Sequence, residues 1–433
     1  MKNITSLKKL AKVFDELFPL NRSLISKENE KTLKILKEYI PFKVLKFKTG
    51  KKINSWTIPQ EWNVKDAYIA SEKKKIIDFK RNNLHLVGYS KKIKKEISFK
   101  ELKKKLFFSS MKKSAIPYVT NYYNNDWGFC LSKKTFDSLS KTKKYKINID
   151  AKFSKSSLKV AEATLKGKTN KTFIFDTYIC HPSMANNELS GPLCMLLIYN
   201  MLRKIKNKQF TYKFIISSET IGPISYLDYL KNNKQIKNIY GAAILTCVGM
   251  NKKIFFKSSK NEKHFFNKLM RKSINKKFVE LRFDPSNGSN DRQYSSPGYN
   301  IESFSLMNLP YSKYSEYHTS LDNKKILSLA GIKSIASIYL KFLKELEKLE
   351  FYKSLYPFGE PFMKKFGLYH NTNKNEQNII KDRNKFIELS KWILSYSDGN
   401  TSLQEISEIS KKKIKDLIKV KNILLKKKLI LKR

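Results

Sequence analysis

Apolar positions along the chain follow a helical period in some segments and a strand-like period in others, and this divides the sequence into regions. Residues 4–40 carry Leu, Ala and Phe at helical spacing, which predicts two helices on either side of the FPLNRS segment, residues 18–23. Between residues 51 and 164 the pattern changes to short runs rich in Trp, Tyr and Ile. Such runs are typical of strands, so we expect a small all-β module there.

Beyond residue 164, continuous apolar runs alternate with apolar helical segments. Runs of this kind predict strands buried on both faces, in a mixed, largely parallel α/β sheet covered by helices. In such sheets, ligands collect at the carboxyl ends of the strands. The predicted strands are 171–179, 212–218 and 241–248, and the predicted helices are 191–205, 224–233 and 327–349.

The C-terminal part of the sequence predicts a separate helical domain. Residues 356–381 are rich in Pro, Gly, Asn and Lys, which indicates a linker. Three helical patterns follow, and the last ends in the strand-like run LILK, an arrangement that resembles a winged helix. We therefore expect an α/β domain formed by residues 1–50 and 165–355, an inserted all-β module at 51–164, and a winged-helix-like domain at 380–433.

The formal net charge of +51 does not by itself define a function. Only eight of the 88 basic residues are Arg, and the Lys residues are spread over nearly the whole chain. A groove that binds nucleic acid is usually richer in Arg, because the planar guanidinium recognises phosphates and bases with two hydrogen bonds. A Lys-biased composition is the favoured explanation, and a polyanionic partner is the alternative.

Cysteine usage and hydropathy indicate a cytoplasmic protein. The four Cys residues are far apart, form no CxxC pair and lie in apolar surroundings, which is typical of buried thiols in a reducing compartment. The first 20 residues form an amphipathic pattern interrupted by Lys, Asp and Glu, unlike a signal peptide. No run approaches the roughly 20 apolar residues of a membrane span.

Three polar segments contain the residue types of a metal centre. CHPSMANNELSG (180–191) follows the first strand of the α/β domain, SSETIG (217–222) follows the second, and EYHTSLDN (316–323) lies near the end of that domain. A zinc site needs neutral His nitrogens and ionised carboxylates that converge on one point, with one position open. His181 comes directly after a strand, so it is a candidate ligand. A lone His near a strand end is also commonly a packing residue.

The loop ANNELSG resembles that of the zinc aminopeptidase and glutamate carboxypeptidase superfamily, in which an Asp four residues before the Gly bridges two metal ions. Asn187 holds that place here. SETIG resembles the Glu-Glu-x-Gly step of the superfamily, whose first Glu is the general base and whose second is a ligand. The resemblance implies that Glu219 is the base and that Thr220 stands at the ligand position. Another Asp is expected near Gly249, where the nearest candidate is Met250.

The later segments extend the resemblance. YHTSLDN is similar to a Tyr-His pair of the superfamily, which implies that His318 is the last ligand and that Tyr317 hydrogen-bonds on the oxyanion side. GSNDRQYSSPGYN (288–300) resembles a Ser-Asp loop that orients the site, with Asn290 in place of the Asp and Asp291 beside it.

Asp291, Arg292 and Tyr294 are the predicted substrate-binding residues. Arg292 and Tyr294 would fix a substrate carboxylate or phosphate through charge-assisted hydrogen bonds. The alternative is that Arg292 only braces the loop. Asp291 directly follows a substituted Asn, so a shift of one residue would bring it toward the site.

The substitutions predict one zinc ion at most. Replacing a bridging carboxylate by Asn removes about one negative charge from between two dications, which repel strongly at about 4 Å. A single ion held by His181, His318 and a carboxylate, Glu188 or Glu219, needs only three protein ligands and a water. Asn187 marks the former bridging position, and Glu188 follows it directly.

Over nearly its whole length the chain resembles a bacterial family of aminopeptidase-like domain proteins with an inserted all-β module and a C-terminal winged helix. The resemblance implies a metal-dependent aminopeptidase-like hydrolase that acts on an amide of a peptide or amino-sugar-type substrate, linked to surface-polysaccharide synthesis. The alternative is a binding or regulatory protein with a degraded metal centre. Its winged helix would dock on a protein or, less favoured, on DNA, because the basic helix has no Gln or Arg and a single Asn, Asn422, to recognise bases.

Overall fold

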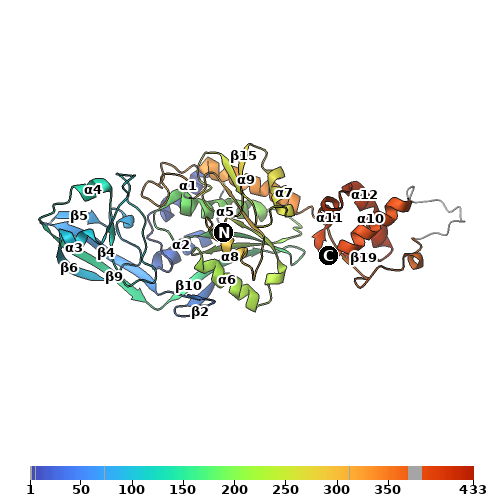
Figure 1. The fold of residues 1–433 in the computed structure, drawn as a ribbon, viewed down its shortest axis with the longest axis horizontal. Coiled ribbons are helices and arrows are strands. Elements are labelled where there is room, and N and C mark those ends of the chain that lie inside the picture. Colours follow the sequence, from blue (N-terminus) through green and yellow to red (C-terminus); the bar gives the residue numbers. More distant parts are fainter. Residues whose placement is uncertain (1, 5, 73, 312, 369–382) are drawn as a thin grey trace. The chain divides into compact units, whose positions relative to one another are not determined.

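The computed structural model describes residues 2–4, 6–72, 74–311, 313–368 and 383–433. The chain divides into two units, Met1–Phe342 and Leu343–Arg433, which are described separately (Figure 1). No helix in the described part of the chain is long and apolar enough to cross a membrane.

The first unit is built on an eight-stranded mixed sheet, as predicted. Its strand order is β1-β10-β12-β11-β13-β16-β14-β15, and the four strands β12, β11, β13 and β16 run parallel to one another. The pairs β1–β10, β10–β12 and β16–β14 are antiparallel, and the pair β14–β15 at the edge is parallel. The strands are β1 (Lys43–Lys48), β10 (Ser157–Leu165), β11 (Thr172–Tyr178), β12 (Thr211–Ser217), β13 (Ile239–Ile244), β14 (Ile254–Lys257), β15 (Phe278–Leu281) and β16 (Ser303–Met307).

Helices cover both faces of this sheet because successive residues of its central strands are apolar, and successive side chains point to opposite faces. Phe173 and Phe175 of β11 meet the rings of helix α9, whereas Ile174 belongs to the apolar cluster that contains Leu227 of α6. Figure 1 shows α9 and α6 on opposite sides of the sheet. The helices of this unit outside the insert are α1 (Leu7–Leu17), α2 (Lys27–Lys37), α5 (Ser190–Leu202), α6 (Ile221–Asn232), α7 (Phe265–Ser273), α8 (Asp291–Tyr294) and α9 (Leu329–Leu346), with the 3-10 turn Ile236–Asn238.

The inserted module is a four-stranded antiparallel sheet with the order β5-β4-β9-β6. We assigned the whole range 51–164 to the inserted module. Strand β10, which begins within that range, instead pairs with β1 and β12 of the central sheet. The aromatic pattern of residues 116–132 predicts strands. In the structure this segment is mostly loop, and only residues 129–130 form a strand there. The elements are β2 (Lys52–Ile53), β3 (Trp56–Thr57), β4 (Glu61–Ser71), β5 (Lys74–Asp78), the 3-10 turn Asn83–His85, β6 (Ile93–Ser98), α3 (Phe99–Lys103), β7 (Leu106–Phe107), β8 (Phe129–Cys130), α4 (Lys133–Asp137) and β9 (Lys144–Ser154).

The second unit is a winged helix, as predicted. Three helices pack around a buried core that includes Leu389, Leu417 and Leu424, beside a three-stranded sheet of order β18-β17-β19. The predicted linker 356–381 contains a 3-10 turn at Met363–Phe366, and its residues 369–381 lie outside the described residues. The elements are β17 (Phe351–Ser354), α10 (Arg383–Tyr396), β18 (Asp398–Ser402), α11 (Leu403–Ser410), α12 (Ile414–Lys426) and β19 (Ile430–Lys432).

Candidate metal centre

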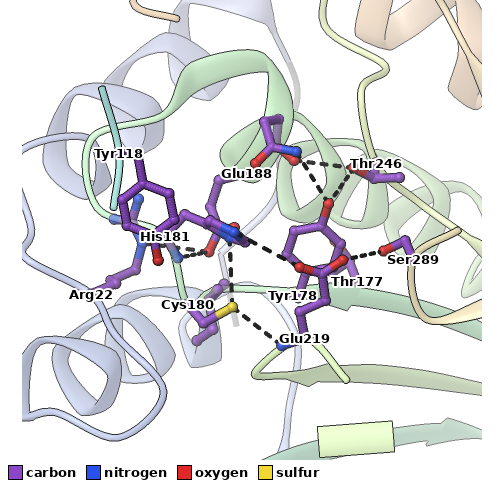
Figure 2. Close-up of polar contacts among 12 residues, drawn as sticks. Arg22, Tyr118, Thr177, Tyr178, Cys180, His181, Glu188, Glu219, Thr246 and Ser289 are labelled. Carbon is purple, nitrogen blue, oxygen red and sulfur yellow. Dashed lines mark hydrogen bonds and ion pairs between the residues drawn. The ribbon is translucent and has the colours of Figure 1, made fainter. Parts of the chain in front are cut away.

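The predicted site residues of the first two loops lie at one edge of the central sheet. Strand β11 ends at Tyr178 and delivers His181, and β12 ends at Ser217 and delivers Glu219. Because β11 and β12 are parallel neighbours, their carboxyl ends meet at the same edge. A π-helical turn, Ala185–Leu189, joins the His181 loop to α5, and Figure 2 shows Glu188 of this turn pointing back at His181.

Glu188 fixes the orientation of the His181 ring. One carboxylate oxygen lies 2.6 Å from Nδ1 of His181, and the other accepts the backbone N–H of the same residue at 2.9 Å. This places the Nδ1 proton toward Glu188 and leaves Nε2 as the free ring position. Burial works against a charged imidazole, but the neighbouring Cys180 sulfur and Glu188 carboxylate together hold the pKa of His181 well above its ordinary value.

A buried arginine completes this arrangement. Arg22 comes from the FPLNRS segment between α1 and α2, and its side chain and that of Glu188 are both fully buried, with Nε of Arg22 4.0 Å from the carboxylate. One terminal nitrogen of Arg22 also donates to the carbonyl of Leu17. Sequence reasoning missed Arg22, although its rarity in a Lys-rich chain was a usable signal.

Glu219 faces the free side of the His181 ring. Its Oε2 lies 3.8 Å from Nε2 of His181, and its Oε1 accepts a hydrogen bond from Ser289 at 2.7 Å (Figure 2). The backbone N–H of Glu219 donates to the sulfur of Cys180 at 3.2 Å. The side chain is 26% exposed, which is enough for a water or substrate to reach the carboxylate.

His318 lies beside His181, as the resemblance implied. The two ring centroids are 5.1 Å apart, and Tyr317 stacks on the His318 ring at 3.9 Å. The Nε2 atom of His318 is buried and has no hydrogen-bond partner among the described residues. Burial, reinforced by the nearby His181, lowers the pKa of His318 to about 3, so the ring is neutral at neutral pH.

A loop of the inserted module closes over both imidazoles. The Tyr118 ring lies 5.0 Å from that of His181 and 5.4 Å from that of His318, and the Tyr118 backbone N–H donates to the His318 carbonyl. Ser320 and Ile116 exchange further hydrogen bonds between the two loops. Tyr118 falls in the segment that the pattern predicts as strand, so sequence reasoning did not place it at the centre.

Asn187 presents an amide to the same region. Its nitrogen donates to the Tyr178 hydroxyl at 3.3 Å, whereas its oxygen is buried without a partner among the described residues. Asp322 holds the turn in place by accepting the backbone N–H groups of Asn186 and Asn187 at 2.6 and 3.0 Å.

The other positions at which the superfamily has carboxylates serve packing and backbone geometry here. Thr220 adopts φ +63°, and its backbone N–H donates to the Asn290 side chain at 3.0 Å. Met250 is 7% exposed and packs in an apolar cluster with Tyr311 and Tyr314. Neither side chain offers a strong metal ligand.

Two of the predicted substrate-binding residues are buried inside the protein. Asp291 is buried and paired with Lys257 at 2.6 Å. Tyr294 is fully buried and donates to Asp176 at 2.6 Å, beneath the site. Both side chains are bonded inside the protein because α8 packs against the sheet. Arg292 is partly exposed and its Nε approaches the Ser289 carbonyl at 3.4 Å, so it braces the loop that carries the Glu219 partner.

Two groupings of side chains have the donor atoms of a zinc site. The first is Cys180, His181 and Glu188, whose donor atoms lie within 4.8 Å of one another. There Nδ1 of His181 is already hydrogen-bonded to Glu188, and Arg22 would place a positive charge close to the ion. The second consists of His181, His318 and Asn187; Nε2 of His318 and the side-chain oxygen of Asn187 are each buried without a partner among the described residues.

The second grouping would use two imidazole nitrogens, which are preferred zinc ligands, and the amide oxygen of Asn187, which is a weaker ligand than a carboxylate. His318 is neutral, whereas the raised pKa of His181 means that zinc would have to displace the proton from its Nε2. In this arrangement Glu188 would not be a ligand and would instead orient a ligating His, whereas in the first grouping it is a ligand. That Glu188 is a metal ligand therefore stays a prediction.

The fold places the chain in a recognised structural class. It is similar to a zinc aminopeptidase from Bacillus subtilis (TM-score 0.57, 13% identity, 78% of this chain and 95% of that chain). It is also similar to a peptidase M28 precursor from Shewanella amazonensis (TM-score 0.55, 11% identity, 78% of this chain and 91% of that chain). The first unit therefore has the aminopeptidase-like fold.

The chain belongs to the family described as Domain of unknown function (DUF4910), which matches residues 11–349, and a winged helix-turn-helix family matches residues 350–432. A candidate polysaccharide biosynthesis protein with an aminopeptidase-like domain from Clostridium acetobutylicum is 35% identical over 399 residues, 91% of this chain and 89% of that protein. A crystal structure of a candidate peptidase from Clostridium acetobutylicum matches with a TM-score of 0.77 and 32% identity over 98% of this chain and 96% of that chain. The predicted family is confirmed.

Proposed function

We propose that the protein is a hydrolase of the aminopeptidase type, dependent on a single zinc ion, that cleaves an amide of a peptide or amino-sugar-type substrate. The proposal rests on Nε2 of His318, which is buried and has no hydrogen-bond partner among the described residues. The His318 ring lies beside that of His181, and Nδ1 of His181 is hydrogen-bonded to Glu188. A buried nitrogen acceptor without a partner costs free energy, so a site with this feature is suited to a bound cation.

The residues divide into ligands and reacting groups. Nε2 of His181, Nε2 of His318 and the oxygen of Asn187 would hold the ion. A zinc ion bound there would supply Lewis-acid polarisation of the scissile carbonyl. Glu219 would accept a proton from the attacking water, because its carboxylate is partly exposed and one oxygen remains free of the Ser289 hydrogen bond.

Tyr317 and Arg292 are the residues that we assign to the substrate. Both are partly exposed, and Tyr317 is held in place by stacking on His318. Its hydroxyl would donate to the developing oxyanion, since burial raises the pKa of Tyr317 and keeps the phenol protonated. Arg292 would pair with an acidic group of the substrate. The link to polysaccharide synthesis is supported by the name of the Clostridium acetobutylicum relative.

A second candidate function has specific support. Thr220 and Met250 occupy places where the superfamily has carboxylates, and Met250 is built into an apolar cluster. These substitutions favour a binding or regulatory protein whose metal centre has lapsed. In that case the winged helix would dock on a protein partner, because α12 buries Leu417, Val420 and Leu424 against its own domain and has only Asn422 among the Asn, Gln and Arg residues that usually recognise bases.

Zinc titration combined with turnover separates the two functions. The test substrates are aminoacyl p-nitroanilides and N-acetylated amino sugars, both of which are amides. Glu219→Gln should retain zinc but lose turnover, whereas His318→Ala should lose both. His264→Asn is the matched control, because His264 caps α7 away from the centre and Asn is an equally good cap. A wild-type protein that takes up no zinc would exclude the hydrolase and leave the binding function.

A further inference from the structure

A groove of about 1110 Å³ lies next to the candidate metal centre, between the α1–α2 segment and the inserted module. Its walls come from α2, β4, β9 and the turn Asn83–His85. Ser183 and Ser320 form part of its floor, each two residues after one of the imidazoles. The groove therefore shares the loops that carry His181 and His318 with the candidate metal centre.

The groove carries an excess of positive charge that the protein does not neutralise. Six cationic residues line it, and only two acidic ones, Glu28 and Asp150. Asp150 already pairs with Lys92, which is not part of the groove, at 3.7 Å. Of the six cations, only Lys80 has an acidic neighbour within ion-pair distance among the described residues, Asp66 at 3.9 Å. The cations are Lys27, Lys31, Lys65, Lys80, Arg81 and Lys152.

Concavity distinguishes these cations from the Lys residues elsewhere on the surface. Charges of one sign that face one another across a cleft focus their field on the space between them. Exposed charges on a convex face are instead screened by salt within about 8 Å at physiological ionic strength. An anionic ligand is thus attracted to this groove more than to the remaining Lys-rich surface.

The neutral residues of the groove indicate a sugar rather than a bare polyanion. Asn21, Asn82 and Asn83 line it. The Asn82 oxygen accepts the Leu84 backbone N–H and the Asn83 nitrogen donates to the Pro19 carbonyl, whereas the Asn83 oxygen is buried without a partner among the described residues. The amide groups that these bonds leave over can donate to and accept from sugar hydroxyl groups. The partly exposed rings of Phe18 and Phe79 add apolar surface on which a sugar ring packs.

We propose that this groove binds an acidic oligosaccharide, with its carboxylates or phosphates on the Lys and Arg side chains and its hydroxyl groups on the Asn amides. The proposal does not depend on hydrolysis at the metal centre, because the groove does not include His181, His318 or Glu219. Since its floor belongs to the same two loops, an occupied groove would hold those loops in place.

The test is direct binding by the full-length protein at physiological salt, measured by fluorescence anisotropy. The probes are labelled oligogalacturonate, a neutral malto-oligosaccharide of the same length, and polyphosphate of the same charge. Oligogalacturonate should bind most tightly of the three. The double variant Lys65→Glu/Arg81→Glu should weaken this binding by at least about tenfold, which is about 1.4 kcal/mol.

The matched control is Lys46→Glu/Lys333→Glu, which changes the net charge equally at exposed positions outside the groove. It should alter binding by less than about twofold. Asn83→Ala should weaken oligogalacturonate binding and leave polyphosphate binding unchanged. Equal losses in the two double variants, or polyphosphate binding as tight as that of the saccharide, would assign the interaction to the general Lys surplus and overturn the proposal.

Discussion

Replacing Glu188 by Gln is the most informative single perturbation of the candidate centre. The carboxylate accepts both the backbone N–H and Nδ1–H of His181, and it is the counterion of Arg22. Gln keeps one acceptor oxygen but turns an N–H₂ donor toward the ring or the backbone. In the first case Nδ1 must become an acceptor, so the ring proton moves to Nε2, the nitrogen that would hold zinc.

The size of the effect follows from the burial of the pair. Both Arg22 and Glu188 are completely buried, and removing one partner of a buried pair typically costs about 3–5 kcal/mol. We expect a loss near 3 kcal/mol in the free energy of unfolding, because Arg22 keeps its bond to the Leu17 carbonyl and approaches Glu188 only to 4.0 Å. Zinc affinity should fall by about 10- to 100-fold, as for other residues that orient a ligating His.

Urea unfolding and zinc titration of the same samples measure the two effects. Glu61→Gln is the matched control, since Glu61 is also buried but its partners, Asn63 and Ser154, are neutral. It should change zinc affinity by less than about twofold. If the Gln variant at 188 bound zinc as tightly as the wild type, the assignment of Nε2 of His181 as the ligand would be refuted.

Three further predictions concern neighbouring positions. Burial raises the pKa of Asp176 to about 7, so its carboxyl group favours the folded state in its protonated form. This contribution to the free energy of unfolding is complete below about pH 4 and is lost as the pH rises through 7. Wild type should therefore lose up to about 4 kcal/mol relative to Asp176→Asn over that range in urea unfolding. Asn187→Asp should raise zinc affinity at least about tenfold while lowering the melting temperature of the zinc-free protein, and unchanged affinity would place its oxygen outside the centre. Thr220→Gly should raise the unfolding free energy by about 1 kcal/mol through relief of its positive φ, whereas Thr220→Ala, which keeps a Cβ, should not.

The central sheet and the winged helix were predictable because their apolar patterns are long and regular. Strands such as β11, in which every residue is buried, leave little ambiguity, and the helices of the C-terminal domain repeat Leu and Ile on one face. The segment 116–132 was not predictable in the same way. Its aromatic residues are typical of strands, but tertiary contacts with the His318 loop hold it as an irregular cover that carries Tyr118.

The site was predictable only where a motif carried it. His181, Glu219 and His318 follow from their segments, and the structure brings them together. The function of Glu188 depends on the direction of its side chain, which is set by the π-helical turn and by Arg22 from more than 160 residues away. Contacts of that range leave no local pattern in a single sequence. The burial of Asp291 and Tyr294 likewise depends on partners remote in sequence, Lys257 and Asp176.

The amount of zinc bound per chain tests the central claim most directly. Protein purified without chelators, equilibrated with zinc and dialysed, should carry about one ion per chain by elemental analysis, and His318→Ala should carry less than about 0.2. A wild-type protein that retains less than about 0.2 zinc per chain, or an alanine variant that retains as much as the wild type, would contradict a metal centre built on His181 and His318.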